Sequence, residues 1–218
     1  MKVKICGMPT LDVAEKVCAL HPDAIGIYID QEMGANFTDL DTAKDIVALA
    51  NKASIETFFL TCLLDASAIE EICNFLGNSH IQLATKTTEI SLEEVVALKK
   101  KLPTVQLVKV IGVTGEESKL LAKKYEASPA IDQLLLDSKV GNLPGGTGVT
   151  HDWNISKGII AASKKPVWLA GGIRLHTVQS AIDLVNPYGV DVETGVQNPD
   201  KSKNYEVIKE FISLVQQN

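Results

Sequence analysis

The chain has 218 residues, a formal net charge of −6 and a pI near 5.3. Hydrophobic residues make up 45% of it and charged residues 22%, which is typical of a globular protein with a sizeable core. The acidic balance and the lack of a basic stripe exclude nucleic acid as an expected partner.

The sequence also argues against membranes, secretion and metals. No apolar run approaches the roughly 18 residues of a membrane span, and the N-terminal MKVKICGMPT lacks the anatomy of a signal peptide. Cys6, Cys18, Cys62 and Cys73 have neither metal-ligand nor disulfide-framework spacing. We therefore expect a cytoplasmic protein without a membrane span or a metal site, in which the last three cysteines are core residues.

Short aliphatic runs alternate with amphipathic stretches along the whole chain, which predicts strands alternating with helices. Sequence SLEE, starting at Ser91, predicts a capping box, and TGEES predicts a helix cap at Thr114 or Gly115. In chain order the strands are expected at 2–6, 24–29, 55–64, 80–84, 105–113, 133–137, 166–170 and 189–193. The helices between and after them are expected at 11–20, 39–51, 66–76, 91–101, 116–125, 154–163, 175–185 and 203–216.

This alternation predicts the fold class. Near-continuous apolar strands separated by helices indicate a parallel sheet that is buried on both faces. Eight such units favour an α/β fold with a single closed (β/α)8 TIM barrel, forming one domain over residues 1–218. The alternative is a doubly wound open sheet, which would normally carry a glycine-rich turn after its first strand. The sequence CGMPT lacks that fingerprint.

In a barrel, the active site lies at the carboxyl ends of the strands. The polar residues expected there are Cys6, Tyr28, Asp30, Gln82, Lys109, Asp137, Glu193 and Thr194. The last two strands are followed by glycines, in LAGGI (Gly171 and Gly172) and VETGV (Gly195). Glycines allow backbone N–H groups to approach an anion closely, so these two loops predict a phosphate site.

Asp137 and Cys6 are the candidate reactive groups, and each has a structural alternative. A carboxylate that closes an apolar strand is partly desolvated, which would raise its pKa and suit a general acid. Asp137 could equally be a helix cap or a salt-bridge partner. Cys6 could be a base or nucleophile if its pKa were lowered, or a core cysteine.

Four motifs in this order resemble the phosphoribosylanthranilate isomerase family. They are KICG at the N-terminus, LLLDS…GGTG..HDW around Asp137, LAGGI, and VDVETGV near the C-terminus. The resemblance runs the length of the chain. It implies a (β/α)8 barrel that catalyses an Amadori rearrangement, an aldose-to-ketose isomerisation of a phosphorylated amino-sugar, without metal or cofactor.

The resemblance also implies roles for individual residues. Cys6 matches the general base that removes the proton from the sugar C2′, and Asp137 matches the general acid that opens the furanose ring. The residues implied to bind substrate, mainly its phosphate, are Gly7, Gly145, Gly146, Thr147, Gly148, Gly171, Gly172, Thr194 and Gly195.

The chain departs from the family pattern in the loops expected to read the rest of the substrate. Thr10, Asn36 and Gly112 stand where arginines are expected, and Ala84 stands for a histidine. His151 replaces phenylalanine, and Glu193 and Thr194 replace a serine pair. The residues we take as altered substrate contacts are Asn36, Gln82, Lys86, His151 and Glu193.

Three hypotheses follow from this combination. The protein isomerises phosphoribosylanthranilate in tryptophan biosynthesis, with carboxylate recognition rebuilt from Lys86 or backbone groups. Alternatively, it acts on another phosphorylated sugar or amino-sugar, or it binds a phosphosugar without catalysis. Its partner is in each case a small phosphorylated molecule, and a monomer and a homodimer both fit the sequence.

Overall fold

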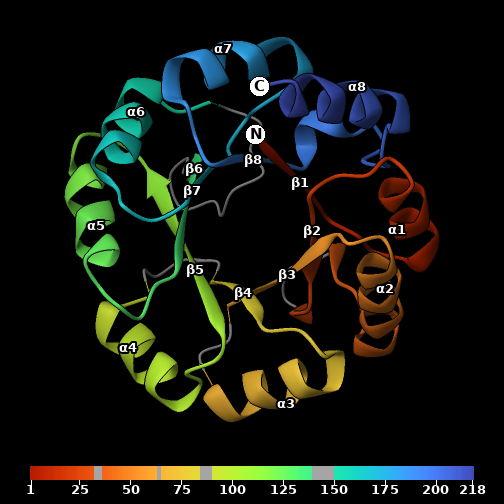
Figure 1. The fold of residues 1–218 in the computed structure, drawn as a ribbon, viewed down its shortest axis with the longest axis horizontal. Helices are drawn as coiled ribbons and strands as arrows, with labels where there is room; N and C mark the ends of the chain where they lie inside the picture. The colour runs from red at the N-terminus through yellow and green to blue at the C-terminus, as the bar shows by residue number, and fades with distance from the viewer. Residues whose placement is uncertain (32–35, 63–64, 84–89, 139–149) are drawn as a thin grey trace.

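The sheet closes into a barrel. The structure is a computed structural model that describes residues 1–31, 36–62, 65–83, 90–138 and 150–218. Eight parallel strands pair in chain order, and the last strand pairs with the first. The helices of the described residues surround this barrel as a ring (Figure 1). The predicted (β/α)8 barrel is confirmed, and the open sheet is excluded.

The elements occur in the predicted order. The strands are β1 (Lys2–Cys6), β2 (Ala24–Tyr28), β3 (Glu56–Thr61), β4 (His80–Leu83), β5 (Gln106–Val113), β6 (Gln133–Ser138), β7 (Val167–Leu169) and β8 (Gly189–Val192). The α-helices are α1 (Leu11–Cys18), α2 (Leu40–Lys52), α3 (Ala66–Leu76), α4 (Leu92–Lys101), α5 (Glu117–Glu126), α6 (Trp153–Ala162), α7 (Leu175–Val185) and α8 (Tyr205–Gln216). A short 3-10 helix, η2 (Thr194–Val196), follows β8.

One predicted helix start is confirmed and one is wrong. Ser91 forms the capping box of α4: its Oγ accepts from Glu94 N–H at 3.2 Å, and its own N–H donates to Glu94 Oε2 at 2.8 Å. Helix α5 is capped by neither Thr114 nor Gly115, because its N-cap is Glu116, which makes no side-chain cap bond. Thr114 instead donates its hydroxyl to Glu117 Oε1 at 2.7 Å.

Buried apolar side chains form two clusters, one between sheet and helices and one inside the barrel. The outer cluster contains Val3 and Ile5 of β1, Leu134 and Leu136 of β6, and the buried faces of the helices. The inner cluster consists of Ala24, Phe58, Val108, Val110, Leu135, Trp168 and Ala170. Both faces of the sheet are therefore apolar, as the near-continuous apolar strands indicated.

Lys4 is a fully buried cation inside this inner cluster. Its ammonium lies 4.9 Å from the centre of the Phe58 ring and 5.6 Å from that of Trp168. It donates to Gln82 Oε1 at 2.5 Å and pairs with Asp191 Oδ2 at 3.2 Å. The inner cluster thus encloses an ion pair directly below the carboxyl ends of the strands.

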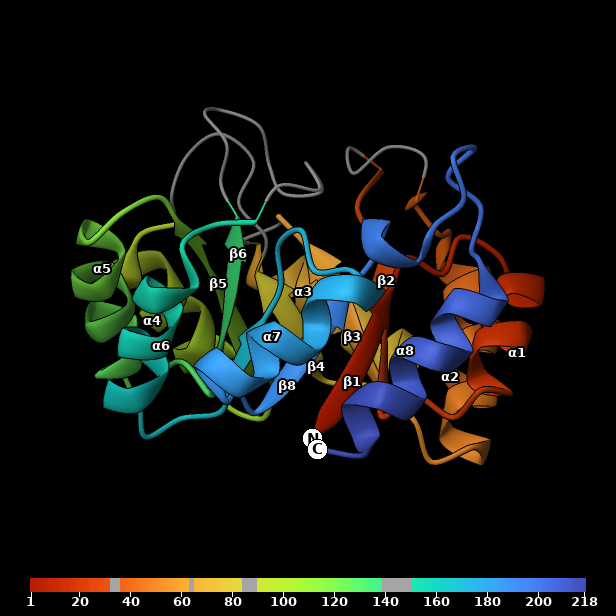
Figure 2. The same ribbon diagram turned by 90° about the horizontal axis from the view of Figure 1, so that it is seen from above.

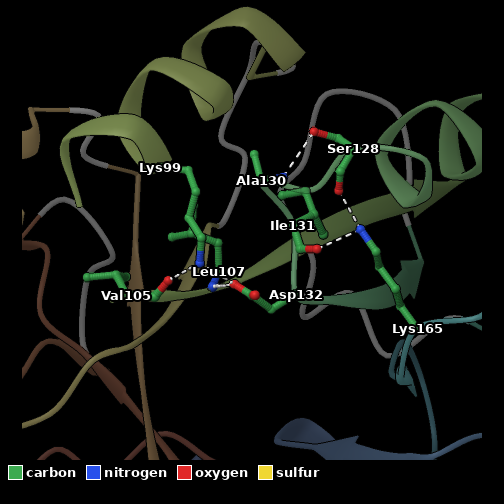
Figure 3. Close-up of polar contacts among 8 residues, drawn as sticks. All are labelled: Lys99, Val105, Leu107, Ser128, Ala130, Ile131, Asp132 and Lys165. Atoms are coloured by element: carbon green, nitrogen blue, oxygen red, sulfur yellow. Dashed lines mark hydrogen bonds and ion pairs between the residues drawn. The ribbon is translucent and has the colours of Figure 1, made fainter. Parts of the chain in front are cut away.

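The opposite end of the barrel is held by backbone and side-chain contacts at the strand starts (Figure 3). Asp132 Oδ2 accepts from Leu107 N–H at 2.7 Å and from Lys99 Nζ at 2.9 Å. Lys165 Nζ donates to Ile131 O at 2.6 Å and to Ser128 O. The two chain ends also lie at this end of the barrel (Figure 2). In the described ranges, no helix is long and apolar enough to span a membrane.

The buried ion pair predicts an unequal response to removing two lysines of the same strand. Lys4→Met leaves Asp191 charged and buried, and we expect the free energy of unfolding to fall by about 3 kcal/mol. Lys2→Met, which removes a partly exposed pair with Glu56 at 2.6 Å, is the matched control and should cost less than about 1 kcal/mol. Denaturant unfolding of both variants measures this, and equal losses would contradict the assignment.

Candidate active site

Four polar side chains lie where the strands finish. Cys6 and Tyr28 are the last residues of β1 and β2, Asp137 is next to last in β6, and Glu193 directly follows β8. Alternate residues of a strand face the same side of a sheet. Cys6 therefore continues the inward-facing row of Lys4 on β1.

A glycine on the neighbouring strand makes room for the Cys6 thiol. Gly26 of β2 lies directly opposite Cys6 in the sheet. A Cβ added at Gly26 would lie 2.3 Å from Cys6 Sγ, so any other residue there would displace the thiol. Cys6 as a whole residue is 3% exposed, so it is buried at the base of the barrel mouth.

The surroundings of Cys6 favour the protonated thiol. Burial raises the pKa of Cys6 well above its usual value, and the charges of Asp191 and Glu193 raise it further, while Lys4 lowers it. The interaction with Asp191 places this carboxylate close to the thiol. A base at this position therefore has to be formed by moving the thiol proton, and Asp191 is the adjacent carboxylate that could receive it.

Asp137 is poised to hold a proton near neutrality. Burial raises its pKa to about 7, and the charges of Asp191 and Glu193 add to the effect. The N–H of Ser138 opposes this by donating to Asp137 Oδ1 at 2.7 Å. The structure shows no helix cap or salt bridge for this carboxyl among the described residues, so its properties match those of a general acid.

Glu193 reaches across the mouth to β2 and to the segment that follows it. Tyr28 donates its hydroxyl to Glu193 Oε2 at 2.6 Å, and the Asn36 side-chain amide donates to Glu193 Oε1. The ammonium of the buried Lys203 donates a hydrogen bond to the backbone carbonyl of Cys6. Burial lowers the pKa of Lys203, an effect that the charge of Glu193 partly offsets.

The glycines after β7 and β8 pack closely against their neighbours. A Cβ at Gly171, whose φ is +82°, would lie 2.3 Å from Ser138 Oγ and 2.9 Å from Asp137 Oδ1. A Cβ at Gly195 would lie 1.9 Å from Ile173 O. Close packing therefore explains why glycine occupies positions 171 and 195. That Gly171 and Gly195 bind phosphate stays a prediction, as do the binding roles of Gly7, Gly172 and Thr194. Gly145, Gly146, Thr147, Gly148 and Lys86 lie outside the described residues.

Several residues expected at the mouth have protein partners instead. His151 bridges Ser138 Oγ at 3.0 Å and Ser156 Oγ at 2.6 Å, and burial lowers its pKa to about 4, so it is neutral. Thr10 is the N-cap of α1 and accepts from Val13 N–H at 3.3 Å. Lys109 faces outward, 5.0 Å from the ring centre of Tyr125.

The structure adds residues that sequence reasoning missed. Lys4 and Asp191 lie one inward position below Cys6 and Glu193, so the period of two residues along each strand could have indicated them. Lys203 precedes α8, where the sequence carries no such signal. Among the described residues, no group of three His, Cys, Asp or Glu side chains could hold a metal ion.

Comparison with known proteins assigns the family. The model of N-(5′-phosphoribosyl)anthranilate (PRA) isomerase matches residues 64–214. An N-(5′-phosphoribosyl)anthranilate isomerase of Methanocella arvoryzae is 31% identical over 98% of this chain and 97% of its own. The chain belongs to the PRA isomerase family.

Solved PRA isomerases share the fold. The enzyme from Pyrococcus furiosus has a TM-score of 0.78 at 26% identity, with full coverage of both chains. A phosphoribosyl anthranilate isomerase in complex with reduced 1-(o-carboxyphenylamino)-1-deoxyribulose 5-phosphate has a TM-score of 0.81 at 22% identity, again with full coverage, which by itself shows only a common barrel.

The pKa of Asp137 predicts that this carboxyl destabilises the fold at neutral and higher pH. Folding takes up a proton between the ordinary pKa of 3.8 and the folded value of about 7, so the free energy of unfolding falls as the pH rises through that window. Asp137→Asn cannot titrate. We therefore expect it to gain stability over the unaltered protein, and to gain on the order of 2 kcal/mol more at about pH 8 than at about pH 5.

Urea unfolding at both pH values measures this gain. Asp45→Asn, on the exposed face of α2, is the matched control for loss of a carboxylate. A gain for Asp137→Asn that is equal at the two pH values would show that the carboxyl is not desolvated.

Proposed function

We propose that this protein isomerises N-(5′-phosphoribosyl)anthranilate to its 1-amino-1-deoxyribulose form, the Amadori rearrangement of tryptophan biosynthesis. The observation that carries the proposal is Asp137, a carboxyl with a pKa of about 7 at the mouth of a PRA isomerase barrel. The ligand of the solved relative, an aminodeoxyribulose phosphate derivative, supports the same substrate class.

Asp137 starts the reaction in this proposal. Its protonated carboxyl donates to the furanose ring oxygen, the bond between C1′ and that oxygen breaks, and an iminium ion forms at C1′. The proton-donating form of a carboxyl with a pKa of about 7 is well populated near neutral pH. An ordinary aspartate would be almost fully ionised there.

Cys6 acts in the next step of the proposed reaction, in which it removes the proton from C2′. The iminium charge acidifies this carbon, and it also favours the thiolate over the thiol. The neighbouring Asp191 takes the proton that the thiol loses, because its Oδ1 has no hydrogen-bond partner among the described residues. The loops after β7 and β8, with Gly171, Gly172, Thr194 and Gly195, would hold the substrate phosphate through backbone N–H groups.

A second candidate substrate is supported by one contact. Asn36, in the place of an expected arginine, donates to Glu193, so at this position a carboxylate and its neutral donor stand where a cation was expected. A phosphorylated amino-sugar without an aryl carboxylate would meet no repulsion there. Acid, base and phosphate loops would act in the same way on that substrate.

Location and assembly follow from the same chemistry. Among the described residues, Cys6, Cys18 and Cys73 form no disulfide, which fits a reducing compartment, and we infer that the protein works in the cytoplasm. Both a monomer and a homodimer are compatible with a barrel whose proposed acid and base come from one chain.

The proposal predicts turnover of phosphoribosylanthranilate by the purified protein and growth of a tryptophan auxotroph that lacks the isomerase. Cys6→Ala and Asp137→Asn should each lower kcat by about 10²-fold or more, because each removes one proton transfer. Cys18→Ala, which changes a buried cysteine of α1, should leave kcat unchanged. The activity should fall as the pH rises above about 7, because Asp137 then loses its proton.

Two outcomes would count against this. A folded protein that leaves phosphoribosylanthranilate unchanged and restores no growth rejects the proposed substrate. Turnover of another phosphorylated amino-sugar, with the same dependence on Cys6 and Asp137, would then establish the second candidate.

A further inference from the structure

Glu193 is held in one orientation by donors from the opposite side of the mouth. The Tyr28 hydroxyl binds Oε2 at 2.6 Å, and the Asn36 amide binds Oε1. An ionised carboxylate can accept about four hydrogen bonds. Counting only donors from the described residues, Glu193 can therefore accept further hydrogen bonds from a ligand, and Tyr28 and Asn36 already hold its side chain in place.

Glu193 also lies next to the reacting groups. A Cβ built on Gly7, the residue after Cys6, would lie 3.0 Å from Glu193 Oε1 and 3.4 Å from Lys203 Nζ. Lys203 in turn donates to the carbonyl of Cys6. The charge of Glu193 raises the pKa of both Cys6 and Asp137, as expected of a carboxylate that lies near both groups.

Below Glu193, the mouth contains a carboxylate oxygen of Asp191 that lacks a donor. Asp191 is 7% exposed, and its Oδ2 pairs with Lys4, but its Oδ1 has no hydrogen-bond partner in the part of the chain that the structure describes. Asp191 and Glu193 are two residues apart along β8 and its end, so both face the mouth. An unpaired buried acceptor is costly, which indicates that this region is completed by a ligand that donates hydrogen bonds.

We infer that Glu193 is a specificity-determining residue, whose carboxylate accepts a hydrogen bond from the substrate hydroxyl on the carbon that gives its proton to Cys6. The inference rests on the proposed function, because it takes Cys6 as the base and a sugar as the substrate. That hydroxyl is bonded to the same carbon as the departing proton, so it lies beside the base in any productive pose. A hydroxyl complements the surplus of acceptors there, whereas a carboxylate would be repelled.

Binding of two simple sugars tests this without requiring turnover. Titration calorimetry compares ribose 5-phosphate with 2-deoxyribose 5-phosphate, which lacks the hydroxyl in question. The unaltered protein should bind the ribose compound at least about tenfold more tightly, the usual effect of a hydrogen bond to a charged group. Glu193→Gln should bind the two sugars with nearly equal affinity.

Two further variants separate recognition from folding. Glu210→Gln removes an exposed carboxylate from α8 and should keep the full preference. Tyr28→Phe removes one donor that holds Glu193 while leaving its charge, and should lose part of the preference. Circular dichroism shows whether each variant is folded. If Glu193→Gln is unfolded, the inference is decided by whether Tyr28→Phe loses part of the preference.

The outcomes distinguish this inference from the proposed function. It is overturned if the unaltered protein binds the two sugars equally or binds neither, or if the folded Glu193→Gln keeps the preference. A preference for ribose 5-phosphate in a protein that does not convert phosphoribosylanthranilate supports the inference and rejects the proposed substrate. Conversion of phosphoribosylanthranilate by a protein that binds the two sugars equally supports the proposed function and overturns the inference.

Discussion

The chemistry of the barrel mouth depends on the buried ion pair between Lys4 and Asp191. Around Cys6 the chain gathers the carboxyl groups of Asp137, Asp191 and Glu193, and burial makes each additional negative charge there more costly. Lys4, 3.2 Å from Asp191, is the cation that lowers the pKa of both Cys6 and Asp137 against these effects. It leaves Asp137 with a pKa of about 7, where a carboxyl both holds a proton and can release it.

Close backbone packing is the second condition for this site, and glycines supply it. Gly26 leaves the space that Cys6 Sγ occupies, and Gly171 allows the loop after β7 to touch Asp137 and Ser138. Ser138 then contacts His151, which is bound to Ser156 of α6. A neutral histidine between two hydroxyls thus ties the end of the acid-bearing strand to the following helix, so the acid is positioned from both sides.

Much of the fold could be predicted from the sequence because its signals are local. Strand and helix periods placed each element to within two residues, except at the end of β3, where the expected 63–64 lie outside the described residues. The cap of α5 was wrong because Thr114 bonds a glutamate side chain and not the helix backbone. Cys6 and Asp137 were located by their places at strand ends, a pattern that a barrel converts into proximity.

The contacts that tune the site are not local, and this is why they were not predicted. Glu193 meets Tyr28 and Asn36 across 165 and 157 residues of chain, and only closure of β8 onto β1 brings them together. Lys109 was expected at the mouth, but one residue of register decides which face of a strand a side chain takes, and it faces Tyr125. Such pairings depend on how the strands close into a barrel, and they cannot be read from the sequence of one strand.

The two candidate substrates differ only in the group attached to the sugar amine. Asp137, Cys6 and the acceptors Asp191 and Glu193 would act on the sugar, and they would serve either substrate equally. The chain has one arginine, Arg174, and it begins α7, away from the Asn36 position where the resemblance led us to expect one. Because Asn36 binds Glu193, an arginine there would meet a carboxylate before it met a substrate. Asn36 and Glu193 are thus a coupled pair: the amide that stands where the resemblance led us to expect an arginine binds the carboxylate that stands where it led us to expect a serine.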